Sequence, residues 1–143
     1  MFTRLLNKFS SSITVQLHEN RLKIVSAEGT ILYEDIPIVA LKKNDNGEDE
    51  IIAIGQSVNT LATSDIAIYR PYANSRIIID DFEKASIILR YAVEKAYGRK
   101  GFFSPKIMIQ VLRKFDNPLT EIEKQVLQEL AQNIGAREVV LKI

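Results

Sequence analysis

Cysteine and tryptophan are absent from this sequence of 143 residues, and histidine occurs once, at His18. The lack of cysteine excludes disulfide bonds and thiolate metal sites, and it is typical of a reducing compartment. A single histidine excludes a metal site built from several imidazoles. No apolar run approaches the roughly 18 residues that span a bilayer, and Asn7 and Lys8 interrupt the N-terminus where a secretory signal would be continuous. We therefore expect a cytoplasmic protein without a metal ion and without a membrane-crossing segment.

A large charge of either sign is also missing. Formal net charge is +1, which gives no electrostatic reason to expect nucleic acid as a partner. Hydrophobic residues make up 46% and charged residues 26% of the chain, a composition typical of a folded globular domain. The length suits one domain with a core of its own.

What the sequence does contain is an amphipathic N-terminal segment, residues 1–9. Four large apolar residues are spaced at i, i+3, i+4 and i+7 and form one stripe of a short helix: Phe2, Leu5, Leu6 and Phe9. Arg4 and Lys8 lie on the other side. Cations beside large apolar side chains are typical of a membrane-surface helix. The alternatives are that the stripe packs on its own domain or on a second copy.

A second apolar element is predicted in a loop, where Phe102 and Phe103 follow the cations Arg99 and Lys100. Cations close to a membrane surface favour anionic lipids by about 1 kcal/mol each. The alternative is that one ring closes the end of the core while the other is exposed.

Alternation and helical spacing predict an α/β domain over residues 13–143. Strands are expected at 13–17, 21–25, 30–33, 36–41, 50–54, 66–69, 106–111 and 137–141, and helices at 56–61, 82–96 and 120–134. The successive early strands predict an antiparallel meander, and the later strands predict parallel additions. The expected architecture is a mixed sheet of about five strands with helices packed on it.

Local signals fix the ends of the two longer helices. Asp80 or Asp81 is predicted to cap the first and Gly98 to end it. Thr120 and Glu123 form a capping-box pattern that opens the second. Its buried face is predicted to consist of Leu119, Ile122, Val126, Leu130 and Ile134.

Several short motifs, in this order, resemble the first subdomain of the bacterial actin homologue family MreB. They are Ile54-Gly55, Ile68-Tyr69-Arg70-Pro71, Ile79-Asp80-Asp81-Phe82, Ser104-Pro105-Lys106 and Ile134-Gly135-Ala136-Arg137-Glu138-Val139. The resemblance covers nearly the whole chain and implies the actin-like, ribonuclease-H-like fold. It also implies a peripheral membrane filament protein, of which this chain would supply about the first of four subdomains.

The sequence departs from the family where the family binds phosphate. The family's first strand ends in an Asp-Leu-Gly-Thr loop, whereas this chain has Gln16 in place of the carboxylate and His18 in place of the glycine. The histidine Cβ would obstruct the approach of backbone N–H groups to phosphate. Glu19 adds negative charge where phosphates would lie. We therefore expect a degenerate phosphate loop, no bound cofactor and no ATP hydrolysis by this chain.

The resemblance is retained in both membrane-binding elements, because the family often carries an N-terminal amphipathic helix and a hydrophobic loop in this subdomain. We therefore predict a non-catalytic module, peripheral at the inner face of the cytoplasmic membrane, that associates with itself, as a homodimer, or with an MreB-type filament. One alternative is half of a split actin-like ATPase that another chain completes. Another is a plain dimeric assembly module.

Overall fold

The computed structural model describes residues 12–62, 64–98 and 104–143. In chain order the elements are β1 (Ser12–His18), β2 (Arg21–Ser26), β3 (Ile31–Asp35), β4 (Val39–Lys43), β5 (Asp49–Ile54), the 3-10 helix η1 (Gly55–Thr60), β6 (Ala67–Tyr69), α2 (Phe82–Tyr97), β7 (Lys106–Val111), α3 (Glu121–Asn133) and β8 (Glu138–Lys142). Each predicted strand and helix overlaps one of these elements.

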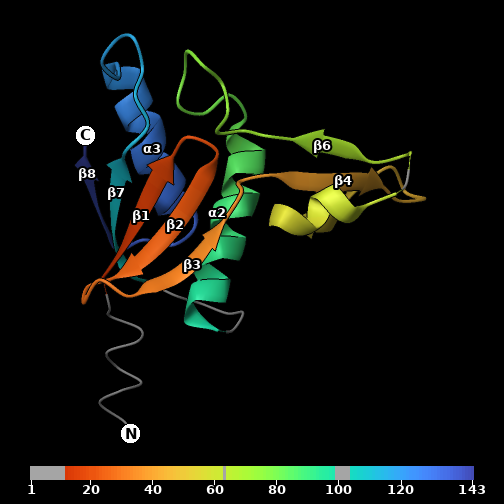
Figure 1. The fold of residues 1–143 in the computed structure, drawn as a ribbon, viewed down its shortest axis with the longest axis horizontal. Coiled ribbons are helices and arrows are strands. Elements are labelled where there is room, and N and C mark those ends of the chain that lie inside the picture. The colour runs from red at the N-terminus through yellow and green to blue at the C-terminus, as the bar shows by residue number, and fades with distance from the viewer. Residues whose placement is uncertain (1–11, 63, 99–103) are drawn as a thin grey trace, which may run out of the picture.

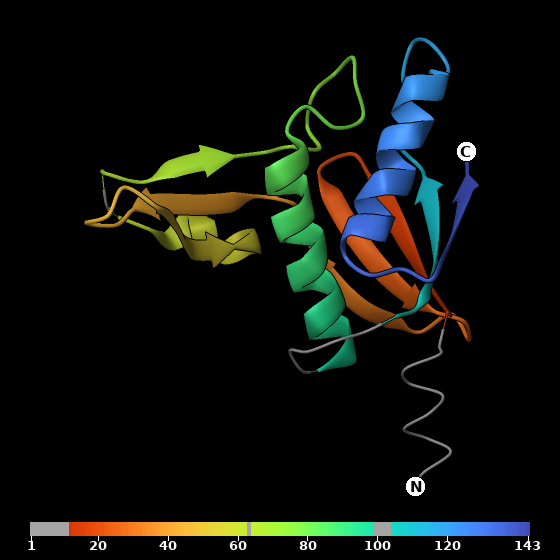
Figure 2. The same ribbon diagram turned by 180° about the vertical axis from the view of Figure 1, so that it is seen from behind.

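Five strands form the main sheet, in the order β3-β2-β1-β7-β8. β1, β2 and β3 are an antiparallel meander, whereas β7 pairs parallel to β1 and β8 parallel to β7. Figure 1 shows this sheet in front of α2 and α3, and Figure 2, seen from behind, shows both helices in front of the sheet. The mixed α/β fold predicted from the sequence is confirmed.

The core lies between the sheet and the two helices. Ile13, Val15 and Leu17 of β1 alternate with polar residues and are at most 3% exposed. They pack in one cluster with the inner faces of α2 and α3. The period of two along the strand and the period of 3.6 along each helix therefore place apolar side chains on facing surfaces.

The remaining three strands form a second sheet, which the sequence analysis did not separate from the first. Its order is β5-β4-β6, with β4 antiparallel to both neighbours. Figure 1 shows β4, β6 and η1 projecting beyond α2. Ile38, Ala40 and Val58 form a small core of their own, while Val39 and Leu41 belong to the main core. Alternation reveals a strand but not its partner, so sequence patterns could not assign β4 to either sheet.

Asp35 and Gly55 join the two sheets where β3 ends and η1 begins. One carboxylate oxygen of Asp35 accepts the backbone N–H of Ile36 at 2.7 Å and that of Gln56 at 2.9 Å. Gly55 has φ +85° and lies so close that a Cβ on it would overlap the Asp35 carboxylate. Glycine is therefore required here for its backbone conformation and for its lack of a side chain.

The predicted helix caps are present. Asp81 is the N-cap of α2 and accepts the Lys84 N–H at 3.1 Å, and Gly98 ends the helix in the left-handed conformation. This capping explains the Asp80–Asp81 pair as a helix start. α3 begins with a complete capping box between Thr120 and Glu123.

The predicted buried face of α3 is wrong at Ile122, which is 75% exposed. The other four predicted positions are confirmed, because Leu119, Leu130 and Ile134 are buried and Val126 is partly buried against the core. Leu127 and Ala131 complete this inward face. Glu123 shares that face in the first turn, where its carboxylate accepts the backbone N–H of the buried Ile78 at 3.1 Å. In the first turn, the inward contact is therefore made by the polar Glu123, while the neighbouring Ile122 faces solvent.

Candidate functional site

The predicted degenerate phosphate loop falls on a tight two-residue hairpin between β1 and β2. Their pairing continues up to His18 opposite Arg21, so only Glu19 and Asn20 form the turn. Asn20 adopts φ 59°, the left-handed conformation that asparagine tolerates in such turns. Both turn residues are exposed. A turn of this length leaves no run of free backbone N–H groups of the kind that surrounds phosphate in a phosphate-binding loop.

The two predicted site residues that precede the turn contact each other. Gln16 Nε2 donates to Gln110 Oε1 of β7 at 3.1 Å, and His18 Nε2 lies 3.3 Å from Gln16 Oε1. The structure thus brings Gln16 and His18 together with Gln110, which the sequence analysis missed because it lies 94 positions from Gln16. All three lie at the carboxyl ends of the adjacent parallel strands β1 and β7.

This cluster consists of two amide side chains and one imidazole. The resemblance predicts that Gln16 replaces a carboxylate, and an amide provides a weaker ligand than a carboxylate for a hard cation such as Mg²⁺. Among the described residues, no three histidine, aspartate or glutamate side chains are close enough together to hold a metal ion. The arrangement can position amide and imidazole groups by hydrogen bonding, but it offers no general base held beside a nucleophile.

Behind the cluster, the chain leaving β7 is fixed to β1 and to the loop before α2. The Leu17 carbonyl accepts the backbone N–H groups of Leu112 and Arg113 at 2.9 and 3.1 Å. The Arg113 guanidinium donates to the carbonyls of Tyr72 and Asn74, the latter at 2.8 Å, and lies 4.3 Å from the centre of the Phe115 ring. The sequence could not predict this contact, because Arg113 binds backbone carbonyls, which every residue has.

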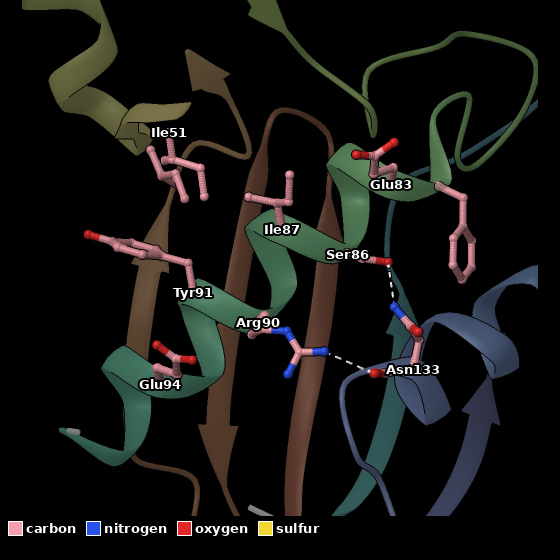
Figure 3. A pocket seen from close by; sticks show the side chains of 10 residues that line it. Ile51, Glu83, Ser86, Ile87, Arg90, Tyr91, Glu94 and Asn133 are labelled. Atoms are coloured by element: carbon pink, nitrogen blue, oxygen red, sulfur yellow. Dashed lines mark hydrogen bonds between the residues drawn. The ribbon is translucent and has the colours of Figure 1, made fainter. Parts of the chain in front are cut away.

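A second candidate surface is a groove of about 630 Å³ along the outer side of α2, between β5 and the end of α3. Figure 3 shows Arg90 pointing toward Asn133, whose carbonyl accepts from the guanidinium at 3.0 Å. The Asn133 amide in turn donates to Ser86 Oγ at 3.2 Å. Ile51 and Tyr91 form the apolar end of the groove. Ser86, Arg90 and Asn133 are thus linked by hydrogen bonds, and the carboxylates of Glu83 and Glu94 also line the groove.

The predicted membrane contacts lie outside the described residues. This applies to the whole set: Phe2, Leu5, Leu6, Phe9, Phe102, Phe103, Arg4, Lys8, Arg99 and Lys100. Within the described part of the chain, no helix has both the length and the apolar character needed to cross a bilayer.

Solved structures share this fold with the chain. MreB5 of Spiroplasma citri bound to ADP superimposes with a TM-score of 0.69 at 18% identity, over 94% of this chain and 38% of that one. A non-polymerising mutant of MamK bound to AMPPNP gives 0.66 at 20% identity, over 92% of this chain and 41% of that one. The MamK double helical filament gives 0.62 at 16% identity, over 92% of this chain and 41% of that one. The chain therefore has an actin-like fold.

The particular family follows from the sequence comparisons. The MreB/Mbl protein family model matches residues 10–142, so the chain belongs to this family. The cell shape-determining protein MreB of Pasteurella multocida is 26% identical over 147 residues, covering 99% of this chain and 40% of that protein. The cell shape-determining protein Mbl of Bacillus cereus is 25% identical over 138 residues, covering 94% of this chain and 38% of that protein. The chain thus spans about two fifths of the length of these relatives.

Proposed function

We propose that this chain is a non-catalytic actin-like module, peripheral at the inner face of the cytoplasmic membrane, that associates with itself or with an MreB-type filament. Membership of the MreB/Mbl family supports a cytoskeletal, cell-shape role. The likeness to the MamK double helical filament supports assembly with actin-like partners.

The observation that carries the non-catalytic part is the closed β1–β2 hairpin. Pairing up to His18 and Arg21 occupies the backbone that a phosphate loop would leave free. The Gln16 amide is bound to Gln110 instead of presenting a carboxylate. A site with these groups supplies neither a phosphate cradle nor a strong cation ligand.

Titration of ATP and Mg²⁺ into the protein tests this part directly. We expect no saturable heat at millimolar nucleotide and no release of phosphate above the rate in buffer. Saturable binding that is lost in the variant His18→Glu, which adds a second carboxylate at the turn, would contradict the proposal.

The membrane part rests on the two apolar elements, residues 1–9 and Phe102–Phe103, which combine large apolar tips with cations. We expect the protein to co-sediment with anionic liposomes and the variant Phe102→Ser/Phe103→Ser to lose most of that binding. Ile122→Ser is the matched control, because it removes an apolar side chain that is exposed on α3. Equal pelleting of the double variant and the control would contradict a membrane role for the loop.

A split ATPase is the second candidate, because MreB5 bound to ADP and MamK bound to AMPPNP share the fold of this chain. It requires a tight, nucleotide-dependent complex with a separate polypeptide, which affinity purification with and without ATP would detect.

A plain dimeric module is distinguished by light scattering after deletion of residues 1–9. Loss of the dimer without liposomes present would indicate that this segment seals a protein interface.

A further inference from the structure

The turn between β4 and β5 contains the one asparagine of the sequence that is followed by glycine, Asn46-Gly47. β4 points away from α2, so this turn lies at the outer end of the second sheet (Figure 1). Asn46 and Gly47 are both exposed. An asparagine side chain can react with the backbone nitrogen of the next residue. The reaction meets least hindrance before glycine, because glycine has no Cβ beside its nitrogen.

The two asparagines of this turn differ in how their side chains are held. Asn44 Oδ1 accepts the backbone N–H of Asn46 at 2.9 Å and that of Glu48 at 3.0 Å. The Asn46 side chain makes no hydrogen bond to another residue in the part of the chain that the structure describes. The Asn44 side chain is therefore fixed to the turn, whereas the Asn46 amide is available for reaction.

Backbone hydrogen bonds hold the nitrogen that would react with Asn46. The Gly47 N–H donates to the Asn44 carbonyl at 3.0 Å, and the Asn44 N–H donates to the Glu48 carbonyl at 2.8 Å. Ring closure requires the Gly47 nitrogen to lose its proton and to approach the Asn46 side chain, so the turn must open locally first. The two hydrogen bonds that Asn44 Oδ1 accepts oppose this opening.

We propose that Asn46 is a site of spontaneous deamidation, and that the Asn44 side chain sets the rate by holding the turn closed. In the open turn, hydroxide removes the Gly47 N–H proton and the nitrogen attacks Cγ of Asn46. The new N–Cγ bond closes a succinimide ring. The Cγ–Nδ2 bond breaks, and the side-chain nitrogen takes up a proton from water and leaves as ammonia. This reaction needs neither membrane nor nucleotide, so it is independent of the proposed function.

Water then opens the ring at one of its two C–N bonds. Cleavage of the N–Cγ bond gives aspartate at position 46, whereas cleavage at the backbone carbonyl gives isoaspartate, whose main chain is longer by the Cβ atom. The longer chain moves the Gly47 N–H out of line with the Asn44 carbonyl. Both products add a carboxylate close to Asp45 and Glu48, while Lys43 is already paired with Asp49 at 3.1 Å. Like charges repel, so we expect modification to weaken the β4–β5 hairpin.

Peptide mapping by mass spectrometry tests the site, after storage of the protein at mildly alkaline pH in buffer and in guanidinium chloride. We expect a carboxyl group to replace the side-chain amide at Asn46, about tenfold faster in guanidinium chloride, where the turn is open. Isoaspartate in the same peptide is detected by methyl transfer from S-adenosylmethionine with an isoaspartyl methyltransferase. No conversion at Asn46, or equal rates in the two solutions, overturns the proposal.

Three variants test the role of Asn44. Asn44→Ala removes both side-chain hydrogen bonds and should speed the reaction in buffer about tenfold. Asn44→Asp keeps the acceptor oxygens and should react at close to the wild-type rate. Asn74→Ala is the matched control, because Asn74 Oδ1 also accepts two backbone N–H groups, from Arg76 at 2.8 Å and Ile77 at 3.1 Å. It should leave the rate at Asn46 unchanged.

In guanidinium chloride the wild type and all three variants should react alike, because the turn is open in each. A wild-type rate for Asn44→Ala in buffer would show that the Asn44 side chain does not hold the turn closed. An equal increase in Asn74→Ala would show that global stability, not the turn, controls the rate. Either result overturns the proposal.

Discussion

At the scale of single residues, Gly55 packs tightly against Asp35 between the two sheets. Gly55 combines a left-handed backbone with a neighbouring carboxylate that leaves no room for a methyl group. Asp35 cannot simply rotate away, because its oxygen accepts two backbone N–H groups. The motif Ile54-Gly55 was noticed in the sequence, but the reason for the glycine is visible only once Asp35 is placed beside it.

Gly55→Ala is therefore expected to lower the free energy of unfolding by about 2–4 kcal/mol, which combines the left-handed backbone strain with disruption of the two hydrogen bonds that Asp35 accepts. Urea denaturation measures this change. Gly47→Ala is the matched control, since Gly47 has φ +78° but nothing within 4 Å of a new Cβ. It should lose only about 1–2 kcal/mol. Equal losses at the two glycines would mean that the Asp35 contact contributes nothing.

At the scale of elements, α3 illustrates how a local signal acquires a distant partner. The pattern Thr120-x-x-Glu123 predicted the capping box, and both of its hydrogen bonds are present. The second carboxylate oxygen of Glu123 also accepts the N–H of Ile78, which is 45 positions away and buried. The capping box therefore also ties the start of α3 to the loop that leads into α2.

We expect Thr120→Ala to cost about 1 kcal/mol of unfolding free energy, the usual value for a lost helix cap. Glu123→Ala should cost more, by about 1–3 kcal/mol, because it leaves the buried Ile78 N–H without an acceptor. Thr120→Ser retains the hydroxyl and should be close to wild type. Thermal or urea unfolding of the three variants gives the order, and a smaller loss for Glu123→Ala than for Thr120→Ala would contradict the role of the Ile78 contact.

At the scale of the whole molecule, the buried Tyr72 and the half-buried Tyr33 make the stability of the fold depend on pH in the alkaline range. Burial raises the pKa of Tyr72 well above its ordinary value, and burial together with the nearby Asp35 raises the pKa of Tyr33. The Tyr72 hydroxyl donates to the Ala85 carbonyl at 2.8 Å, whereas the Tyr33 hydroxyl has no partner among the described residues. Both phenols therefore stay protonated in the folded state at a pH where the unfolded chain loses its phenol protons.

Stability is consequently full below the unfolded pKa of about 10 and falls as pH rises above it, since the folded state then binds more protons than the unfolded state. For the fully buried Tyr72 the slope approaches about 1.4 kcal/mol per pH unit. Urea denaturation between about pH 8 and pH 11.5, a range that begins below the unfolded pKa and ends above it, measures this slope. Tyr72→Phe should flatten the slope and lose about 1 kcal/mol at neutral pH with its hydrogen bond. Tyr33→Phe should flatten it less and cost little at neutral pH. An unchanged slope in Tyr72→Phe would refute this account.

The sequence alone determined the elements that depend on near neighbours. Alternation over a few residues defined β1, β2 and β7, and capping residues defined both ends of α2. The order of short motifs identified the MreB/Mbl family, which the family model confirms. The predicted membrane contacts and the absence of catalysis stay predictions.

Only the tertiary structure decided which distant segments meet. It assigned β4, β5 and β6 to a separate sheet, joined Gln16 to Gln110, and turned Ile122 outward. A local pattern records the preference of each residue for a buried or exposed position, and many partners can satisfy that preference. The choice among partners is made by strand register and by hydrogen bonds between residues far apart in the chain, neither of which a short stretch of sequence encodes.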